Sequence, residues 1–406
     1  MVKKFFHTIL LRRHFWRYAS FDEVASLYVS RMLRMAALHL MSAFTSIYLY
    51  QLGYSVATIA FLWAGFYATK VLCALTVARL TAWIGPKHTI LVSNLLYIPV
   101  MISYAMLPQY GIHLLIPTLI AQAISTTMYT VAYNVDFSKV KSLQHAGKEI
   151  AYMNMFEKIT TGLSPLIGGF IAFAWGPKAA IIIAALLFAF AAAPLLRTGE
   201  PITINRKLTF RGFPWKLLFR HSLAQFSYGF DVFVSGTMWS LYVAIMILGV
   251  SASNNTVYAA TGALVSVVFI VAILASYTYG RIIDRRRGRE LMRIATIANA
   301  VTHVMRPFVQ SPVTVAGLNA ANELATTGYT LPYTRALFDN ADISGSRVTY
   351  LGVAEMLANV GACVAAVLLG CAALVSTEDV ALRAFFFVGA AVSLLVLTAR
   401  FPLYKK

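Results

Sequence analysis

Residues 126–133 read TTMYTVAY, and residues 326–333 read TTGYTLPY. Both follow the pattern T-T-x-Y-T-x-x-Y, and each lies in a long apolar segment that is the fourth of its own half of the 406-residue chain. The first threonine and the two tyrosines fall at i, i+3 and i+7, which places them on one face of a helix. A duplicated apolar chain is typical of secondary transporters, whose solute site lies between the repeats. Chance similarity between two apolar helices is the alternative, but other landmarks repeat at nearly the same offset.

The composition predicts a membrane protein. Apolar residues make up 59% of the chain and charged residues 12%, whereas a soluble domain carries about a quarter charged residues. A bilayer-spanning helix needs about 20 apolar residues. Twelve such segments are expected, at about 30–52, 55–77, 89–107, 113–135, 152–175, 178–196, 223–249, 257–279, 292–310, 312–334, 349–375 and 380–402. We therefore expect an all-α membrane protein with twelve transmembrane helices in two pseudo-symmetric six-helix bundles.

The polar stretches divide this chain into four parts. Basic and aromatic residues interleave near the start, which is typical of an interfacial amphipathic helix rather than a cleaved signal peptide. The longest connection is polar and basic and lies at the midpoint. The expected parts are an amphipathic N-terminal segment (1–24), a first bundle (25–196), a linker (197–222) and a second bundle (223–406).

The net charge of +19 follows the membrane topology. Most of the 34 lysines and arginines lie in the termini and in the loops after even-numbered spans, and Arg306 is among the few assigned to the opposite loops. Short cytoplasmic loops are enriched in Lys and Arg, so both termini are expected in the cytoplasm of a plasma or bacterial inner membrane. The excess charge would contact anionic lipid headgroups. This distribution argues against nucleic acid as a partner, and a monomer is expected.

A basic loop in the second half suggests a family. Residues 280–290 read GRIIDRRRGRE, which resembles the signature loop G-x-L-x-D-R-x-G-R-R/K of the major facilitator superfamily. It differs by one extra residue before Gly288 and by Glu290 in the last place. The corresponding first-half loop, ARLTAWIGPK at 78–87, is degenerate, with Ala82 in place of Asp and Trp83 in place of Arg.

The resemblance implies a fold and a mechanism. In this superfamily two bundles rock about a central cavity lined by helices 1, 4, 7 and 10, and the loop holds the cytoplasmic side closed. Carried over, Asp284, Arg285 and Gly288 would act in gating, with Asp284 near Lys148 or Arg335. A solvated loop that only sets topology is the alternative.

A second motif concerns the direction of transport. Residues 162–169 read GLSPLIGG, which resembles the G-P-x-x-G-G core of helix 5 in proton-coupled exporters of the superfamily. The match favours export over import. Ordinary tight packing of membrane helices would also use Pro165, Gly168 and Gly169.

Ionisable residues within the apolar segments are candidate functional groups, because a charge in the membrane is costly unless it is paired or hydrated. Glu323 lies near the middle of the tenth span, and burial would let it exchange a proton near neutral pH. It is the candidate for proton coupling or cation recognition; a structural carboxylate is the alternative. The stripes expected to line the cavity comprise Gln122, Thr126, Tyr129, Tyr133, Asn319, Glu323, Thr326, Tyr329 and Tyr333.

Other intramembrane charges are expected to form gating pairs. Lys70 and Glu355 lie at comparable depth in spans 2 and 11, so a Lys70–Glu355 pair is predicted. Arg34 and Asp231 occupy near-equivalent positions of the two halves, and a pair between them is predicted near the cytoplasmic mouth.

Two neighbouring residues of span 5 have separate assignments. Glu157 is expected to pair with Arg34 or Arg31 of span 1 and to act in gating. Lys158 is expected to face the membrane interface or a headgroup.

The chain lacks the motifs of ATP-driven transport and of catalysis. It contains no P-loop, no H-E-x-x-H and no G-x-S-x-G sequence, and no metal-ligand spacing. We therefore expect no cofactor and no enzymatic activity, with protons and a small-molecule solute as partners in gradient-driven transport. An uncoupled facilitator and a transporter-derived receptor or scaffold remain alternatives, and the identity of the solute is open.

Overall fold

The computed structural model describes residues 21–42, 44–140, 146–197, 208, 210–250 and 255–404. These residues form helices and their connections, and no strand occurs among them. The predicted amphipathic segment 1–24 lies almost entirely outside the described residues, as does much of the predicted linker 197–222.

The helices of the first half are joined by short turns. Gly85 and Gly176 adopt left-handed φ angles of 89° and 83°, which glycine reaches without steric cost. Pro86 and Pro177 follow them at the first positions of the next helices, where the missing N–H has no intrahelical partner. The elements are α2 (Phe21–Ser42), α3 (Thr45–Gln51), α4 (Val56–Ile84), α5 (Pro86–Tyr110), α6 (Ile112–Val140), α7 (Ala146–Trp175), α8 (Pro177–Ala192) and η1 (Ala193–Arg197).

The second half repeats this pattern with more broken helices. Its longest helix, α15, starts with a capping box in which Ser311 and Thr314 each accept a bond from the other's backbone N–H. The elements are α9 (Trp215–Phe219), α10 (Ser222–Val232), η2 (Phe233–Met238), α11 (Trp239–Tyr242), η3 (Val243–Ile247), α12 (Thr256–Ser266), α13 (Phe269–Ile282), η4 (Ile283–Arg287), α14 (Gly288–Met305), η5 (Arg306–Phe308), α15 (Pro312–Ile343), α16 (Arg347–Val375), α17 (Glu378–Ser393), η6 (Leu394–Thr398) and η7 (Pro402–Tyr404).

Consecutive helical elements join into twelve membrane-spanning helical segments, which we call rods. Nine segments of the described chain are long and apolar enough to cross a membrane, and the 53-residue segment Thr256–Phe308 holds two rods, α12–α13 and α14. The remaining rods are α7 and α15. The predicted fold class is confirmed: the chain is an all-α, twelve-helix membrane protein in two six-helix halves. The residue boundaries assigned to the halves stay a prediction.

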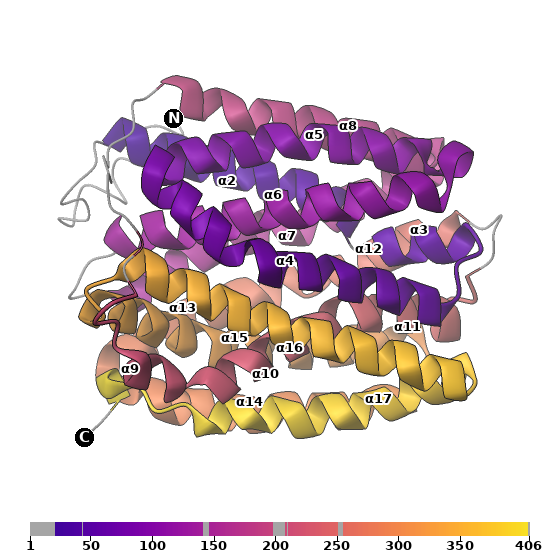
Figure 1. The fold of residues 1–406 in the computed structure, drawn as a ribbon. Helices are drawn as coiled ribbons and strands as arrows, with labels where there is room; N and C mark the ends of the chain where they lie inside the picture. Colours follow the sequence, from indigo (N-terminus) through magenta and orange to yellow (C-terminus); the bar gives the residue numbers. More distant parts are fainter. Residues whose placement is uncertain are drawn as a thin grey trace.

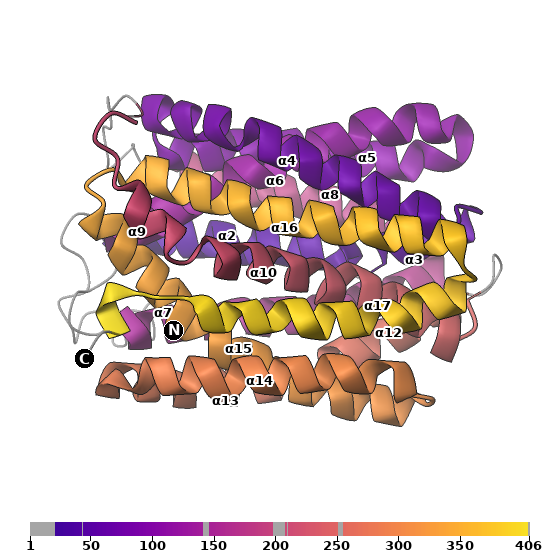
Figure 2. The same cartoon turned by 60° about the horizontal axis from the view of Figure 1, so that its bottom comes forward.

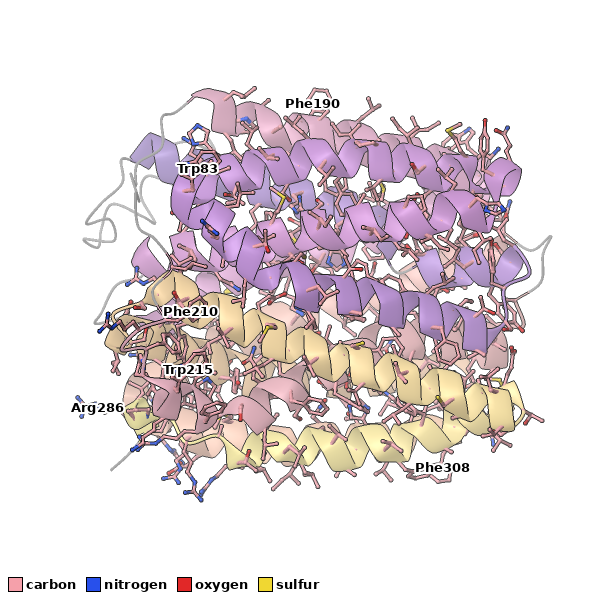
Figure 3. The ribbon with its side chains drawn as sticks, viewed as in Figure 1. Trp83, Phe190, Phe210, Trp215, Arg286 and Phe308 are labelled. Atoms are coloured by element: carbon pink, nitrogen blue, oxygen red, sulfur yellow. The ribbon has the colours of Figure 1, made fainter. Side chains whose placement is uncertain are left out.

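The rods run roughly along one axis, with α9 at one end of the bundle and α3 at the other (Figure 1). We call these the α9 end and the α3 end. The two halves meet where α4 lies beside α16 (Figure 2) and where α7 packs against α12 and α13. Large apolar side chains such as Phe190 and Phe308 point outward and are 62% and 69% exposed (Figure 3). An apolar outer surface is what a protein surrounded by lipid requires.

Glycines bring α7 close to the second half. A Cβ atom added at Gly169 would overlap the carbonyl oxygen of Tyr258, and one at Gly262 would overlap that of Pro165. A Cβ at Gly162 would overlap the side chain of Phe269. The GLSPLIGG segment therefore forms part of the contact between the halves, as small residues do where membrane helices approach closely.

Candidate functional site

An ion pair joins the two halves in the middle of the bundle. Lys158 Nζ on α7 lies 2.8 Å from Glu323 Oε1 on α15, and Thr327 Oγ1 donates a hydrogen bond of 2.7 Å to the same oxygen. The side chains of Lys158 and Glu323 are 29% and 13% exposed. The prediction that Lys158 faces the membrane interface is wrong, because packing of α7 against α15 turns it toward Glu323.

A second ion pair links the halves along α4 and α16. Lys70 Nζ lies 3.3 Å from Glu355 Oε1, and Asn359 Nδ2 donates to the same carboxylate oxygen at 2.9 Å. The predicted pair is present, and its gating role stays a prediction. In both pairs the first half supplies the cation and the second half supplies the carboxylate.

A third pair lies within the first half. Arg31 Nη2 lies 2.5 Å from Glu157 Oε2, so Arg31, and not Arg34, is the partner of Glu157. The Arg31 guanidinium also lies 3.5 Å from the ring centroid of Tyr133, and its Nη1 donates to the Tyr129 hydroxyl at 3.4 Å.

Arg34 lies in the interior of the first half. Its Nη1 donates to Asn94 Oδ1 at 2.6 Å, and its guanidinium lies 4.0 Å from the ring centroid of Tyr129. The side chain is 1% exposed. The predicted pair between Arg34 and Asp231 is therefore wrong: each residue points into the core of its own half.

Asp231 belongs to a buried polar cluster of the second half. Asp231 Oδ1 lies 2.6 Å from His303 Nε2, and Oδ2 accepts from the Tyr329 hydroxyl at 2.5 Å. Arg306 Nη1 lies 3.0 Å from His303 Nδ1. A guanidinium can only donate, so Nδ1 accepts and Nε2 carries the proton that is donated to Asp231. His303 is therefore a neutral link between a carboxylate and a guanidinium.

Sequence reasoning missed two members of this cluster. His303 was not singled out, and Arg306 was assigned to a loop, whereas it is 1% exposed inside the bundle. The two residues are three positions apart on one helical face, which was the available signal.

Most of the predicted cavity-lining residues bond within their own half. Gln122 donates to the Tyr97 hydroxyl at 2.9 Å, and the Tyr333 hydroxyl donates to Gln225 at 2.6 Å. The Trp239 indole donates to Asn319 at 2.7 Å. Thr126 donates to the Gln122 carbonyl and Thr326 donates to Asn299. Solute binding by these residues stays a prediction.

The second-half signature loop forms a compact contact at the α9 end. Arg335 Nη1 lies 3.1 Å from Asp284 Oδ1, one of the two predicted partners; the Lys148 side chain lies outside the described residues. Arg286 has a left-handed φ of 63°, which accommodates the extra residue before Gly288. Trp83, the residue in place of Arg in the degenerate loop, is 73% exposed at the same end (Figure 3).

Gly288 and Arg285 occupy different environments in this loop. A Cβ at Gly288 would lie 2.8 Å from the Tyr404 hydroxyl, so glycine permits close packing there. Arg285 is exposed. Gating by either residue stays a prediction.

A carboxylate also joins the halves at the α3 end. Glu378 Oε1 accepts from the backbone N–H of Val56 at 2.9 Å, and Oε2 accepts from the Tyr50 hydroxyl at 3.2 Å. Val56 is the first residue of α4, so the positive end of that helix dipole faces Glu378. Sequence reasoning did not single out this contact.

Two repeated six-helix halves joined by ion pairs are the architecture typical of a secondary transporter. A sequence profile described as Major Facilitator Superfamily matches residues 26–234, just over half of the chain. The chain belongs to this superfamily and is a multi-pass integral membrane protein. A search of curated protein sequences found no significant match.

Solved structures share this fold at low sequence identity. The human organic anion transporter MFSD10 (TETRAN) has a TM-score of 0.67 at 15% identity, with 93% of this chain and 98% of that chain covered. A variant of the E. coli fucose:proton symporter FucP has a TM-score of 0.63 at 13% identity, with 92% and 97% covered. A variant of the nucleoside transporter NupG has a TM-score of 0.67 at 14% identity, with 94% and 99% covered.

Proposed function

We propose that this protein moves a small solute across the membrane by alternating access and couples this movement to protons through Glu323. The observation that carries the proposal is the Lys158–Glu323 ion pair between the halves. Protonation of Glu323 would remove its charge and weaken the pair, so the proton would shift the balance between conformations in which the halves are joined or parted. A proton-coupled symporter among the proteins of similar fold supports coupling on this scaffold.

Further parts of the proposal concern orientation and direction. Arg286 of the basic signature loop lies at the α9 end (Figure 3), so we place that end in the cytoplasm, next to anionic lipid headgroups. The resemblance of residues 162–169 to the exporter motif favours export. Lys70 and Glu355 would hold the halves together during part of the cycle, and Asp284 would act in gating through its contact with Arg335 in the second half. The protein would act as a monomer, without a catalytic step.

The test is a proton-flux assay on the purified protein in liposomes that contain a pH-sensitive dye. A panel of sugars, nucleosides, organic ions and amphipathic drugs is added in turn to wild type, to Glu323→Gln and to Glu290→Gln. Glu290 is the control because it is an exposed carboxylate whose partner, Arg287, lies on the same turn. We expect a solute to move protons with wild type and Glu290→Gln, and not with Glu323→Gln.

Other outcomes identify the alternatives. Solute flux that persists in Glu323→Gln without proton movement would define a facilitator in which Glu323 has another role. Absence of solute flux and of solute-dependent changes in cysteine accessibility would define a receptor or scaffold.

A further inference from the structure

Arg31, Arg34, Lys70 and Lys158 lie deep within the predicted spans of the first half, and among the described residues all but Arg34 have a carboxylate partner. Arg31 pairs with Glu157, Lys70 with Glu355 and Lys158 with Glu323. Arg34 has no such carboxylate among the described residues. The ionisable groups that interact with its charge are the side chains of Tyr129, Tyr97 and Arg31, of which the last is a second cation.

The hydrogen bonds of Arg34 are also incomplete. Nη1 donates to Asn94 Oδ1, whereas Nη2 is buried without a partner in the described part of the chain. The rest of the guanidinium environment is aromatic, with ring centroids at 4.0 Å for Tyr129 and at 5.4 Å for both Tyr97 and Phe188. Ring contacts attract a cation, but they compensate a buried charge less than an anion does.

Arg31 and Arg34 share Tyr129. Arg31 Nη1 donates to the Tyr129 hydroxyl, while Arg34 lies over the face of the same ring. Arg31 Nε is likewise buried without a hydrogen-bond partner among the described residues. Two guanidinium groups that each have a free donor, with only one carboxylate between them, have the chemistry that binds a carboxylate or phosphate through charge-assisted hydrogen bonds.

We propose that Arg31 and Arg34 form the anion-binding part of the solute site and that the transported solute bears a carboxylate or phosphate group. Arg31, whose side chain is 11% exposed, makes the first contact. Displacement of the Tyr129 ring then brings the anionic group to Arg34. This inference rests on the proposed transport of a solute, but it does not depend on proton coupling through Glu323.

The test compares three probes of matched size and different charge: benzoate, benzyl alcohol and benzylammonium. The thermal unfolding midpoint of the purified full-length protein in neutral detergent is measured with each. Benzoate is expected to raise the midpoint, and the other two are not. Arg34→Gln is expected to weaken the benzoate response roughly tenfold or more in apparent affinity. Lys178→Gln removes an exposed cation from the same half and should respond as wild type does.

A second measurement needs no ligand. Gln can still donate to Asn94 but carries no charge, so Arg34→Gln is expected to raise the unfolding midpoint of the free protein if the Arg34 charge is uncompensated. A lower midpoint would show that Arg34 is a structural residue and would overturn the proposal. Stabilisation by benzylammonium, by none of the probes, or by benzoate independently of Arg34 would overturn it as well.

The unfolding measurement reports binding and the liposome measurement reports proton flux, so loss of anion binding in Arg34→Gln and loss of proton coupling in Glu323→Gln are distinguishable. A further experiment separates the solute from a lipid as the source of the anion. Phosphatidylglycerol added to the micelles tests a lipid headgroup as the source of the anion. Arg34-dependent stabilisation by this lipid without a benzoate response would assign the two arginines to lipid and overturn the solute assignment.

Discussion

Lys158 and Glu323 face each other across the boundary between the halves, with Nζ and Oε1 2.8 Å apart. The two residues lie on helices that occupy different positions in their halves, α7 and α15. Any movement that separates these helices must break this pair or carry both side chains along.

Exchange of the two charges tests whether the pair stabilises the contact. Lys158→Glu places two carboxylates together and should lower the free energy of unfolding by about 1–3 kcal/mol, with the lower part of the range favoured because Lys158 is 29% exposed. The double variant Lys158→Glu/Glu323→Lys should recover most of this loss. Thermal unfolding of the wild type, of Lys158→Glu, of Glu323→Lys and of the double variant gives the coupling free energy between the two residues. If the effects of the two single substitutions add in the double variant, the pair does not contribute to stability.

The Lys70–Glu355 pair is more enclosed, with side chains 12% and 13% exposed. Lys70→Met leaves a carboxylate without its cation and should destabilise the protein by about 3 kcal/mol. Replacement of both residues by Met should cost much less, because the uncompensated charge is gone.

The exposed Arg287–Glu290 pair provides the comparison for this experiment. Arg287→Met should change the free energy of unfolding by less than about 1 kcal/mol. If Lys70→Met behaves like Arg287→Met in thermal unfolding, water rather than Glu355 stabilises the lysine.

The fold could be predicted from the sequence because span length and apolarity are local properties. The bilayer fixes the length of each helix, and the repeated motif fixes the division into halves. Helix ends were less predictable: α4 continues to Ile84, well past the expected end at 77, because a helix can continue beyond the stretch that crosses the membrane.

Ion pairs could be predicted where depth alone decided them. Lys70 and Glu355 share a depth on helices that meet, and their pair is present. The Arg34–Asp231 prediction failed because equivalence by symmetry places two residues alike in their own halves, not next to each other. Lys158 was misplaced because sequence gives depth but not the direction in which a side chain points around a helix.

Close packing at Gly169 predicts an asymmetry between two glycine substitutions. Gly169→Ala places a Cβ against the Tyr258 carbonyl oxygen and should destabilise the protein by about 1–3 kcal/mol. Gly65 is also helical, but a Cβ added there would meet no atom within 4 Å. Gly65→Ala should therefore leave stability unchanged or raise it by up to about 1 kcal/mol. Thermal unfolding of both variants tests this prediction. Equal changes in stability for Gly169→Ala and Gly65→Ala would mean that α7 and α12 can move apart freely.

His221 predicts acid sensitivity at the junction of α9 and α10. It is 1% exposed, and its Nε2 lies 2.8 Å from the Tyr350 hydroxyl. Burial lowers the pKa of His221 to about 4. Because the unfolded chain takes up this proton near pH 6.5, stability should fall as the pH drops from about 6.5 toward 4, by about 2 kcal/mol at pH 5.

Substitution of this histidine should remove that part of the pH dependence. The unfolding midpoint of His221→Gln should decline less between pH 7.5 and pH 5 than that of wild type. His113→Gln removes an exposed histidine and should decline as wild type does. If the unfolding midpoint of His221→Gln falls with pH as steeply as that of wild type, other groups govern acid unfolding.

Glu378 is expected to hold the two halves together at the α3 end, because it accepts hydrogen bonds from the Val56 backbone N–H and from the Tyr50 hydroxyl of the opposite half. Loss of these hydrogen bonds in Glu378→Ala should raise the equilibrium constant for opening at the α3 end roughly tenfold. The reporter is Val56→Cys, a fully buried position that keeps its backbone N–H, in a chain whose three native cysteines are replaced by alanine. A thiol reagent should label this cysteine faster in Glu378→Ala.

Asp379→Ala is the matched control for this experiment, since Asp379 pairs with Arg383 on its own helix. If both variants label at the wild-type rate, Glu378 does not hold the halves together, and closure at this end depends on the glycine contacts between α7 and α12 instead.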